Sequence, residues 1–305
     1  MELISPNTNF NFIGKRRAFA AVSAALIVLS FVSLVIKGGP RYGVDFEGGT
    51  IVQIKFDRPA PLAQIREALS ALDLGDYSLQ EYGSPEEALV RVRKSEDEAG
   101  GETRAQLVEG ALRKAFAQSF TVERVETVGP KVGGDLRQKA LLAILYTLAG
   151  LLIYITLRFE FRFGVAAILA LAHDTIITIG AFSLLDKEMT LTVVAAILTL
   201  IGFSLNDTIV VFDRIRENLR LKRGMALPDL INLSVNQTLS RTILTSGTVF
   251  LVVVALFFLG GEVIHDFAFA MLVGVVVGTY SSVFIASPIL ILWDEYRRAR
   301  AARGR

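Results

Sequence analysis

The chain contains 305 residues, of which 52% are hydrophobic and 20% are charged, with a formal net charge of +2 and a mean hydropathy of +0.49. Half of the charged residues lie between positions 37 and 137, and the rest of the chain contains apolar runs of about 20 residues, which excludes a soluble single-domain enzyme. The absence of cysteine, the presence of only two histidines and the balanced charge leave no basis for a disulfide framework, a multi-histidine metal centre, a cofactor, enzymatic activity or nucleic-acid binding.

The first predicted element is a membrane span over Ala18–Ile36, which follows Lys15, Arg16 and Arg17. A helix of about 20 apolar residues crosses the ~30 Å hydrocarbon core of a bilayer. A signal peptide has the same basic start, but its apolar core is about 7–15 residues long and ends in a cleavage site of small residues. This run is longer and ends in Ile-Lys-Gly-Gly-Pro, so we interpret it as a membrane anchor.

The next segment, residues 38–136, has the periodicity of a small α+β domain. Alternation of apolar and polar residues predicts four strands, at Thr50–Phe56, Tyr77–Tyr82, Ala88–Arg93 and Phe120–Val128. Helical spacing predicts two helices, at Pro61–Leu72 and Glu102–Gln118. A Gly-Ser-Pro sequence between the second and third strands predicts a hairpin turn. The order βαββαβ is that of a ferredoxin-like domain.

A glycine-rich stretch, Gly43-Val44-Asp45-Phe46-Glu47-Gly48-Gly49-Thr50, leads into the first strand. The paired glycines predict a tight turn, in which Asp45 accepts hydrogen bonds from local backbone amides. A contact between substrate and Asp45 or Glu47 is the alternative interpretation.

Five further spans follow, at Ala140–Leu157, Gly164–Leu185, Met189–Phe212, Thr242–Gly260 and Phe267–Trp293. None alternates like an outer-membrane strand, so we predict an α-helical integral membrane protein with six transmembrane helices and the ferredoxin-like domain inserted between helices 1 and 2. Pro288 is expected to bend or end the last span. A ladder of small residues in that span predicts a face that packs closely on another helix, in this chain or in a partner: Ala270, Gly274, Gly278 and Ser282.

The basic residues predict the orientation, because Lys and Arg are enriched in short cytoplasmic loops. One side of the predicted topology contains fifteen of them, and the short loops of the other side contain only Lys187. The fifteen are Lys15, Arg16, Arg17, Arg158, Arg162, Arg214, Arg216, Arg220, Lys222, Arg223, Arg297, Arg298, Arg300, Arg303 and Arg305. We therefore expect both termini to be cytoplasmic and residues 38–136 to be extracytoplasmic.

These predictions divide the chain into four parts. Residues 1–37 form the N-terminus and first span, 38–136 the external domain, 137–293 the other five spans, and 294–305 a basic cytoplasmic tail. Within the third part, the segment at about 214–237 is predicted to be amphipathic and to lie at the cytoplasmic interface.

Two ionisable residues in predicted spans are the main candidates for function, because a charge in mid-bilayer costs about 2.5–3.5 kcal/mol and normally faces a partner or a water-filled cavity. Asp207 lies in the fourth span, after Asn206, and Arg241 opens the fifth span. A polar stripe at helical spacing includes Arg241: Ser234, Thr238, Arg241, Thr245 and Thr248. Placed opposite Asp207 and Asn206, this stripe predicts a proton route; the alternative is an Asp–Arg pair that only locks two helices together.

Asp174, near the middle of the third span, is a secondary candidate with Asn206 and Thr245. A structural hydrogen bond to a neighbouring helix and a place in the proton route are both open for Asp174. His173 lies about 100° around the helix from it, so we do not expect the two side chains to converge on one ligand.

Five sequence motifs, in this order, make the chain similar to the SecF family, the smaller subunits of the bacterial SecD–SecF protein-export factor, which is related to the resistance-nodulation-division transporters. They are GVDFEGGT (43–50), VGPKVGGDLRQKAL (128–141), AHDTIITIGAFSL (172–184), LTLIGFSLNDTIVVFDRIREN (198–218) and SRTILTS (240–246). The resemblance covers nearly the whole chain.

The resemblance implies a location in the bacterial inner membrane and a role late in preprotein translocation, driven by the proton motive force. It implies SecD, the SecYEG translocon with its auxiliary subunits, the preprotein and the lipid bilayer as partners. Asp207 and Arg241 occupy the family's proton-pathway positions. Two other functions stay open: a proton-driven efflux transporter subunit and a structural membrane assembly factor.

Overall fold

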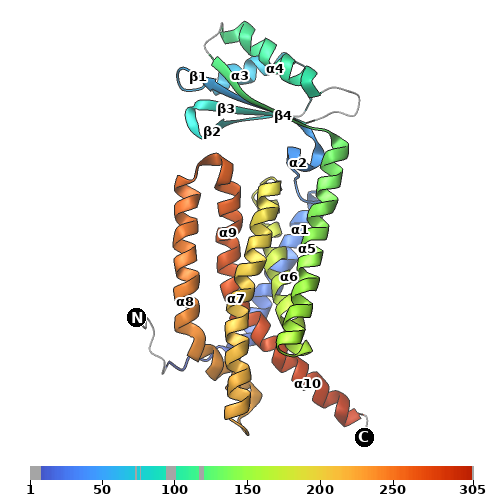
Figure 1. Cartoon of the computed structure of the whole chain (residues 1–305), viewed down its shortest axis with the longest axis vertical. Helices are drawn as coiled ribbons and strands as arrows, with labels where there is room; N and C mark the ends of the chain where they lie inside the picture. Colours follow the sequence, from blue (N-terminus) through green and yellow to red (C-terminus); the bar gives the residue numbers. More distant parts are fainter. Residues whose placement is uncertain (1–7, 73, 76, 94–100, 117–119, 304–305) are drawn as a thin grey trace.

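The molecule consists of a helical bundle with a small sheet domain at one end (Figure 1). The computed structural model describes residues 8–72, 74–75, 77–93, 101–116 and 120–303. The bundle contains α1 (Arg16–Ile36), α5 (Pro130–Arg158), α6 (Phe161–Leu184), α7 (Leu191–Leu221), α8 (Leu227–Leu259), α9 (Gly261–Ser281) and α10 (Ser287–Arg303). A 3-10 turn, Ile13–Lys15, leads into α1, and a π-helical segment, Ser282–Ala286, joins α9 to α10.

Six helical segments in the described residues are long and apolar enough to cross a membrane, which confirms the predicted number. Helix α5 contains the second predicted span. It begins at Pro130, shortly after the last strand, so it starts earlier than the predicted span, which begins at Ala140. The segment at about 214–237, predicted to be amphipathic, comprises the end of α7 and the first turns of α8. In its α8 part, Leu230, Ile231 and Ser234 are buried.

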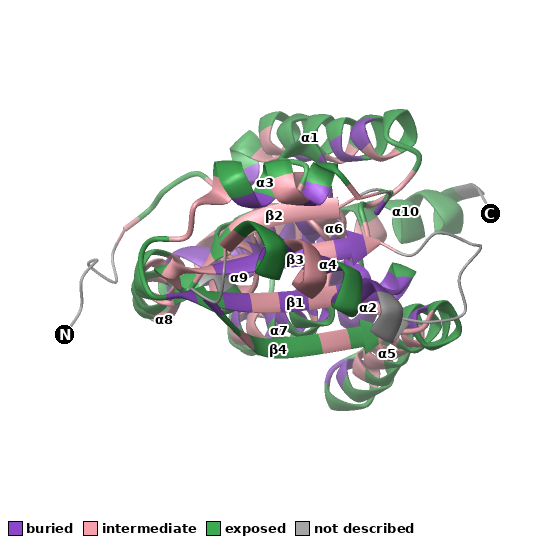
Figure 2. Ribbon diagram, turned by 90° about the horizontal axis from the view of Figure 1, so that it is seen from above, coloured by how far each residue is buried: buried purple, intermediate pink, exposed green. Residues whose placement is uncertain are grey.

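The sheet domain has the predicted ferredoxin-like order: β1 (Gly49–Phe56), α3 (Leu62–Ser70), β2 (Tyr77–Tyr82), β3 (Ser84–Arg93), α4 (Gly101–Phe116) and β4 (Phe120–Val128). The strands lie in the order β2-β3-β1-β4, and all neighbouring strands are antiparallel. Seen from above, α3 and α4 cover one face of the sheet, and its other face lies over the bundle (Figures 1 and 2).

The hairpin between β2 and β3 is tighter than predicted. Gly83 alone forms the turn, with φ +74°, and Ser84 and Pro85 already belong to β3. Proline has no backbone N–H to donate to a neighbouring strand, and Pro85 is tolerated because it lies near the start of β3. The domain core lies between the sheet and its two helices, where alternate residues such as Val52, Ile54 and Val90 are fully buried.

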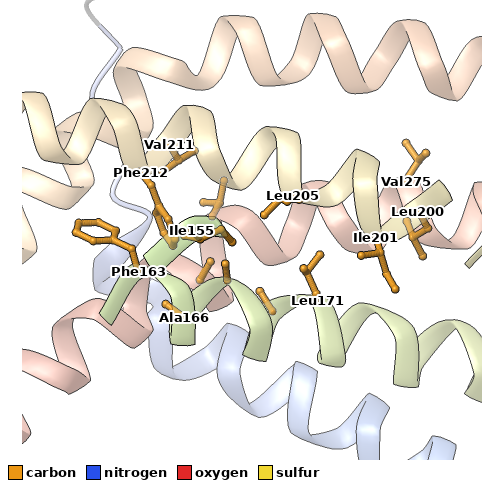
Figure 3. Packing of buried hydrophobic residues seen from close by; sticks show 14 of the residues in the cluster. Ile155, Phe163, Ala166, Leu171, Leu200, Ile201, Leu205, Val211, Phe212 and Val275 are labelled. Carbon is orange, nitrogen blue, oxygen red and sulfur yellow. The ribbon is translucent and has the colours of Figure 1, made fainter. Parts of the chain in front are cut away.

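The centre of the bundle is formed by α6, α7 and α9, and α1, α5 and α8 lie at its edge. More than half of the apolar window of α6 and of α7 is buried, against 17% or less for α1, α5 and α8. Figure 3 shows the packing, in which Phe163 of α6 faces Phe212 of α7 and Ile155 of α5. Most apolar side chains of α1, α5 and α8 therefore face outward, away from the other helices of the bundle.

The ladder of small residues in the last span packs against α7 of the same chain. A Cβ added to Gly278 would lie 2.9 Å from Cβ of Ser204, and one added to Gly274 would overlap Leu200. The close approach of two helix backbones thus requires residues without side chains here. The last span also bends as predicted: the π-helical segment lies directly before Pro288, and α10 leaves the bundle at an angle (Figure 1).

The sheet domain is joined to the bundle through the loop between α6 and α7. Glu188 in this loop forms ion pairs with Arg91 and Arg93 of β3, at 3.2 and 3.7 Å, and with Arg41, at 3.5 Å. The neighbouring Asp186 pairs with Lys37 and Arg41. The hydrogen bond and charge of Lys37, with the charge of Arg41, hold the pKa of Asp186 below its ordinary value of 3.8.

The glycine-rich stretch before β1 also takes part in this junction. Val44–Glu47 forms the short helix α2, and the carboxylate of Asp45 accepts a hydrogen bond at 2.9 Å from the backbone amide of Leu191, the first residue of α7. The expected bond to a local amide is therefore wrong: Asp45 caps a distant helix, where a negative charge favours the positive end of the helix dipole. Gly48 and Gly49 adopt positive φ values at the turn into β1, as the sequence predicts.

Candidate functional site

Asp207 is buried in the bundle, on a face of α7 that meets α8. Asp207 is 2% exposed, and its sequence neighbours Asn206 and Thr208 are also polar. The hydroxyl of Ser246 donates to Oδ2 of Asp207 at 2.7 Å, and the hydroxyl of Thr245 lies 3.3 Å from Oδ1. Both donors belong to α8, so the carboxylate is bound across a helix–helix contact rather than by its own helix.

Arg241 lies near this carboxylate but does not pair with it. In the described part of the chain, no guanidinium nitrogen of Arg241 comes within 4.0 Å of Asp207. Arg241 is exposed, and it lines a cavity of about 540 Å³ together with Asn206, Asp213 and Gln237. The cavity lies between α5, α7 and α8, on the side of the bundle that holds the ends of α7 and α10.

The predicted polar stripe of α8 is only partly correct. Ser234 and Thr238 are buried, as expected, but the buried line then continues through Thr242 and Ser246. Arg241 and Thr248 are exposed, and Thr245 lies between the two faces. With 3.6 residues per turn, either Arg241 or Thr242 could follow Thr238 on the buried face of α8. Which of the two is buried depends on how α8 is rotated against α7.

Asp174 forms a second polar centre, on α6. Its Oδ2 accepts hydrogen bonds from Ser204 of α7, at 2.6 Å, and from Ser281 of α9, at 2.8 Å. Its Oδ1 lies 2.9 Å from Nδ1 of His173. The structural hydrogen bond considered for Asp174 is thus present. His173 and Asp174 also contact each other, which their separation of about 100° on the helix did not predict, because the side-chain torsions turn the two groups together.

Hydroxyl groups connect the helix that bears Asp174 with the helix that bears Asp207. The Thr208 hydroxyl, next in sequence to Asp207, lies 3.2 Å from the carbonyl of Ser204 and 3.1 Å from the hydroxyl of Ser282. Ser204 in turn donates to Asp174. The sequence analysis did not single out Ser204, Ser246 or Ser281 as site residues; their only signal was that each is a small polar residue close to a candidate or to the small-residue ladder.

The ionisable groups at these centres are the carboxylates of Asp207 and Asp174 and the imidazole of His173. Among the described residues, no three His, Asp or Glu side chains come together in a way that would hold a metal ion. A buried carboxylate held by hydroxyl donors can exist in the ionised or the protonated form, since each hydroxyl can donate to the first and also accept from the second. The described residues form a multi-pass helical membrane protein with two buried carboxylates between its apolar helices.

Comparison with known proteins gives the family. The model for "Protein export membrane protein SecD/SecF, C-terminal" matches residues 108–296, and the model for the "SecD/SecF GG Motif" matches residues 32–60. The chain is 47% identical to the protein translocase subunit SecF of Calditerrivibrio nitroreducens, over 98% of each chain, and 50% identical to that of Magnetococcus marinus, over 99% of this chain and 97% of that one. The chain belongs to the SecD/SecF family.

Solved structures agree with this assignment. The crystal structure of SecDF, a translocon-associated membrane protein from Thermus thermophilus, matches 96% of this chain with a TM-score of 0.83 and 38% identity. A second SecDF structure, in a super-membrane-facing form, matches with a TM-score of 0.72. The chain spans about 40% of the SecDF chains it matches. These matches confirm the six-helix membrane fold with its inserted sheet domain.

Proposed function

We propose that this chain is the SecF subunit of a protein-export complex with SecD, and that the complex uses the proton motive force to promote late steps of preprotein translocation. The names of the relatives support the export role, and the SecDF structure supports SecD as the partner and an association with the translocon. In this proposal SecYEG, with its auxiliary subunits, passes the preprotein to the complex. The chain itself binds and moves rather than catalyses.

The buried carboxylate of Asp207 carries the proton-coupling part of this proposal. It is bound across the contact between α7 and α8, so its protonation would change the hydrogen bonds that join the two helices. Arg241 lines a cavity beside it without pairing with it in this conformation. A movable cation near a buried carboxylate can favour the charged form in one state and leave the neutral form in another, which is what coupling to a proton gradient requires. In this proposal Thr245 supports the site by donating a hydrogen bond to Asp207, and Asn206 supports it by lining the cavity that contains Arg241.

The distribution of basic residues supports the proposed orientation in the bacterial inner membrane. The first described residues and α10 lie at the end of the bundle opposite the sheet domain (Figure 1). The ends of α7 and α10, which contain most of the predicted cytoplasmic Arg residues, lie at that same end. With both termini cytoplasmic, the sheet domain, within residues 38–136, stands outside and would meet the emerging preprotein.

The absence of an Asp207–Arg241 ion pair weakens the alternative of a static helix lock. A lock between two helices would need the two charges in contact, because an unpaired buried charge is costly. In the described residues, the contacts of Asp207 are instead two hydroxyls that suit either protonation state. The efflux alternative has no specific feature in its favour in this structure.

The proposal is tested with the Asp207→Asn variant, reconstituted with SecD in proteoliposomes. Asparagine keeps an oxygen that can accept from Ser246 but cannot bind a proton. We expect proton flux and proton-driven export to fall to the level of liposomes without the complex, with the complex still assembled. Asp229→Asn, the same change at an exposed residue in the first turn of α8, should leave both unchanged. Wild-type flux and export in Asp207→Asn would refute proton coupling through this residue.

A further inference from the structure

A second buried ionisable centre lies apart from Asp207, in the middle of α6. In the described part of the bundle, the buried side chains that can carry a charge are Asp207, Asp174 and His173. His173 is 5% exposed and Asp174 is 1% exposed. Nδ1 of His173 lies 2.9 Å from Oδ1 of Asp174, whereas Nε2 of His173 is buried and has no hydrogen-bond partner.

Side chains of α7 and α9 contact this pair. From α7 the hydroxyl of Ser204 donates to Asp174, and from α9 the hydroxyl of Ser281 does the same. Also from α9, the ring of Tyr280 is stacked on the imidazole, with centroids 6.2 Å apart. The hydroxyl of Tyr280 contacts α1, through Ser23 and the carbonyl of Phe19. No Lys or Arg of the described residues is buried beside the pair, so Asp174 has only His173 as a possible counter-charge.

The arrangement of the two ring nitrogens determines what the pair can do. When Nδ1 carries the proton and donates it to Asp174, Nε2 of the neutral imidazole is an unprotonated acceptor. That tautomer satisfies the carboxylate and leaves no unpaired donor in the apolar interior, where an unmade hydrogen bond costs about 1–3 kcal/mol. Nε2 is therefore the atom at which a further proton would bind, and the adjacent carboxylate would balance the resulting positive charge.

We propose that His173 and Asp174 form a second proton-binding site, which takes up one proton at Nε2 of His173 and regulates proton movement through the site at Asp207. This inference rests on the proposed function for its role in proton movement. On protonation no covalent bond other than N–H forms, and the carboxylate remains ionised as the counter-charge.

The link to Asp207 is short. Ser204, which donates to Asp174, also presents its carbonyl to Thr208, the neighbour of Asp207. An imidazolium at position 173 would draw the Asp174 carboxylate toward His173 and weaken its bonds to Ser204 and Ser281. Ser204 and Thr208 lie on one face of α7, so a weaker bond between Ser204 and Asp174 would alter the hydrogen bonds of the helix that positions Asp207.

The test uses the fact that the sequence contains only two histidines, His173 and His265. The full chain, in complex with SecD, is labelled with ¹⁵N-histidine, and the imidazole signals are recorded between about pH 5 and about pH 8, the range in which histidine titrates. The His265→Gln variant assigns the two signal sets. We expect Nε2 of His173 to shift from the unprotonated to the protonated position in this range, and we expect the Asp174→Asn variant to lose that shift.

The second readout is the pH dependence of proton flux in proteoliposomes. His173→Gln should change the shape of the flux–pH profile, and His265→Gln should not. An Nε2 signal that stays unprotonated across the whole range would overturn the proposed site. So would a His173→Gln profile with the wild-type shape, because the site would then have no part in proton movement.

The two proposals fail separately. If Asp207→Asn conducts protons normally, the proposed function fails, but the ¹⁵N titration still decides whether His173 binds a proton. If Asp207→Asn abolishes flux and His173 does not titrate, the proposed function stands and this inference fails. The decisive titration is measured with His173 and Asp174 intact, so its outcome does not depend on whether Asp174→Asn or His173→Gln folds.

Discussion

At the residue scale, the two buried carboxylates of the bundle accept hydrogen bonds across helices from small hydroxyl side chains. Ser246 of α8 binds Asp207 of α7, and Ser204 of α7 binds Asp174 of α6. Serine donors of this kind can reach a carboxylate only where the helix backbones approach closely. Gly278 of α9 provides that approach at Ser204, so glycine and serine positions act together.

A substitution at Gly278 tests this arrangement. A Cβ at position 278 would lie 2.9 Å from Cβ of Ser204, so Gly278→Ala should force α9 away from α7 and cost about 1–3 kcal/mol, as overpacking does. The measurement is the unfolding midpoint in mixed micelles. Gly202→Ala is the matched control, since no atom lies within 4 Å of a Cβ there and a helical Gly→Ala change is neutral or favourable by up to about 1 kcal/mol. Equal stability of the two variants would contradict the close contact.

At the scale of elements, the loop between α6 and α7 joins the sheet domain to the helix that bears Asp207. Glu188 binds Arg91 and Arg93 of β3, and Asp45, just before β1, caps the first residue of α7. A movement of α7 along its axis would therefore act on β1 and β3 through charged contacts. This junction therefore connects the sheet domain with the helix that bears Asp207, in addition to the chain connections through α1 and α5.

The pH dependence of the junction follows from Asp186, whose pKa is lowered by Lys37 and Arg41. A carboxyl group whose pKa is lower in the folded state stabilises that state above its unfolded value and loses this contribution as the pH falls through the folded pKa. The contacts of Asp186 should therefore be unaffected between about pH 5 and about pH 8 and weaken only below its ordinary value of 3.8.

Asp186→Asn at neutral pH should reproduce the acid behaviour of the junction. The chain contains no cysteine, so spin labels can be attached at Glu81→Cys in β2 and Val263→Cys in α9. We expect the distance distribution between these labels to broaden in Asp186→Asn at neutral pH and in the unsubstituted background only at acid pH. Glu123→Gln, whose partner Lys55 lies within the sheet, is the control. A distribution that is unchanged in Asp186→Asn would show that Asp186 does not hold the junction.

At the scale of the whole molecule, apolar surface and basic charge together define how the chain lies in a membrane. The outer helices α1, α5 and α8 expose large apolar side chains such as Val35, Leu157 and Leu259, which suits lipid or a partner subunit. The basic ends of α7 and α10 lie at one end of the bundle and the sheet domain at the other (Figure 1).

The proposed orientation predicts the accessibility of single cysteines in a chain that has none of its own. A membrane-impermeant maleimide added to spheroplasts should label Glu81→Cys in the sheet domain and should label Ala301→Cys in α10 only after the membrane is permeabilised. Both positions are exposed, so a difference in labelling reports the side of the membrane. The reverse pattern would invert the proposed topology.

The sequence alone determined the number of spans and the ferredoxin-like order of the inserted domain, and it singled out Asp207 and Asp174 as ionisable residues within apolar spans. These features are local or periodic: the length of an apolar run identifies a span, and the period of the apolar residues distinguishes the strands from the helices, without knowledge of neighbouring elements. Family membership also followed from local motifs.

Only the tertiary structure decided which groups meet. The rotation of α8 against α7 placed Ser246, not Arg241, on the Asp207 carboxylate, and the fold brought Asp45 to the start of α7. His173 and Asp174 pair although they are adjacent on one helix. Such contacts depend on helix rotation and side-chain rotamers, and the spacing of residues in a sequence limits these choices without selecting among them.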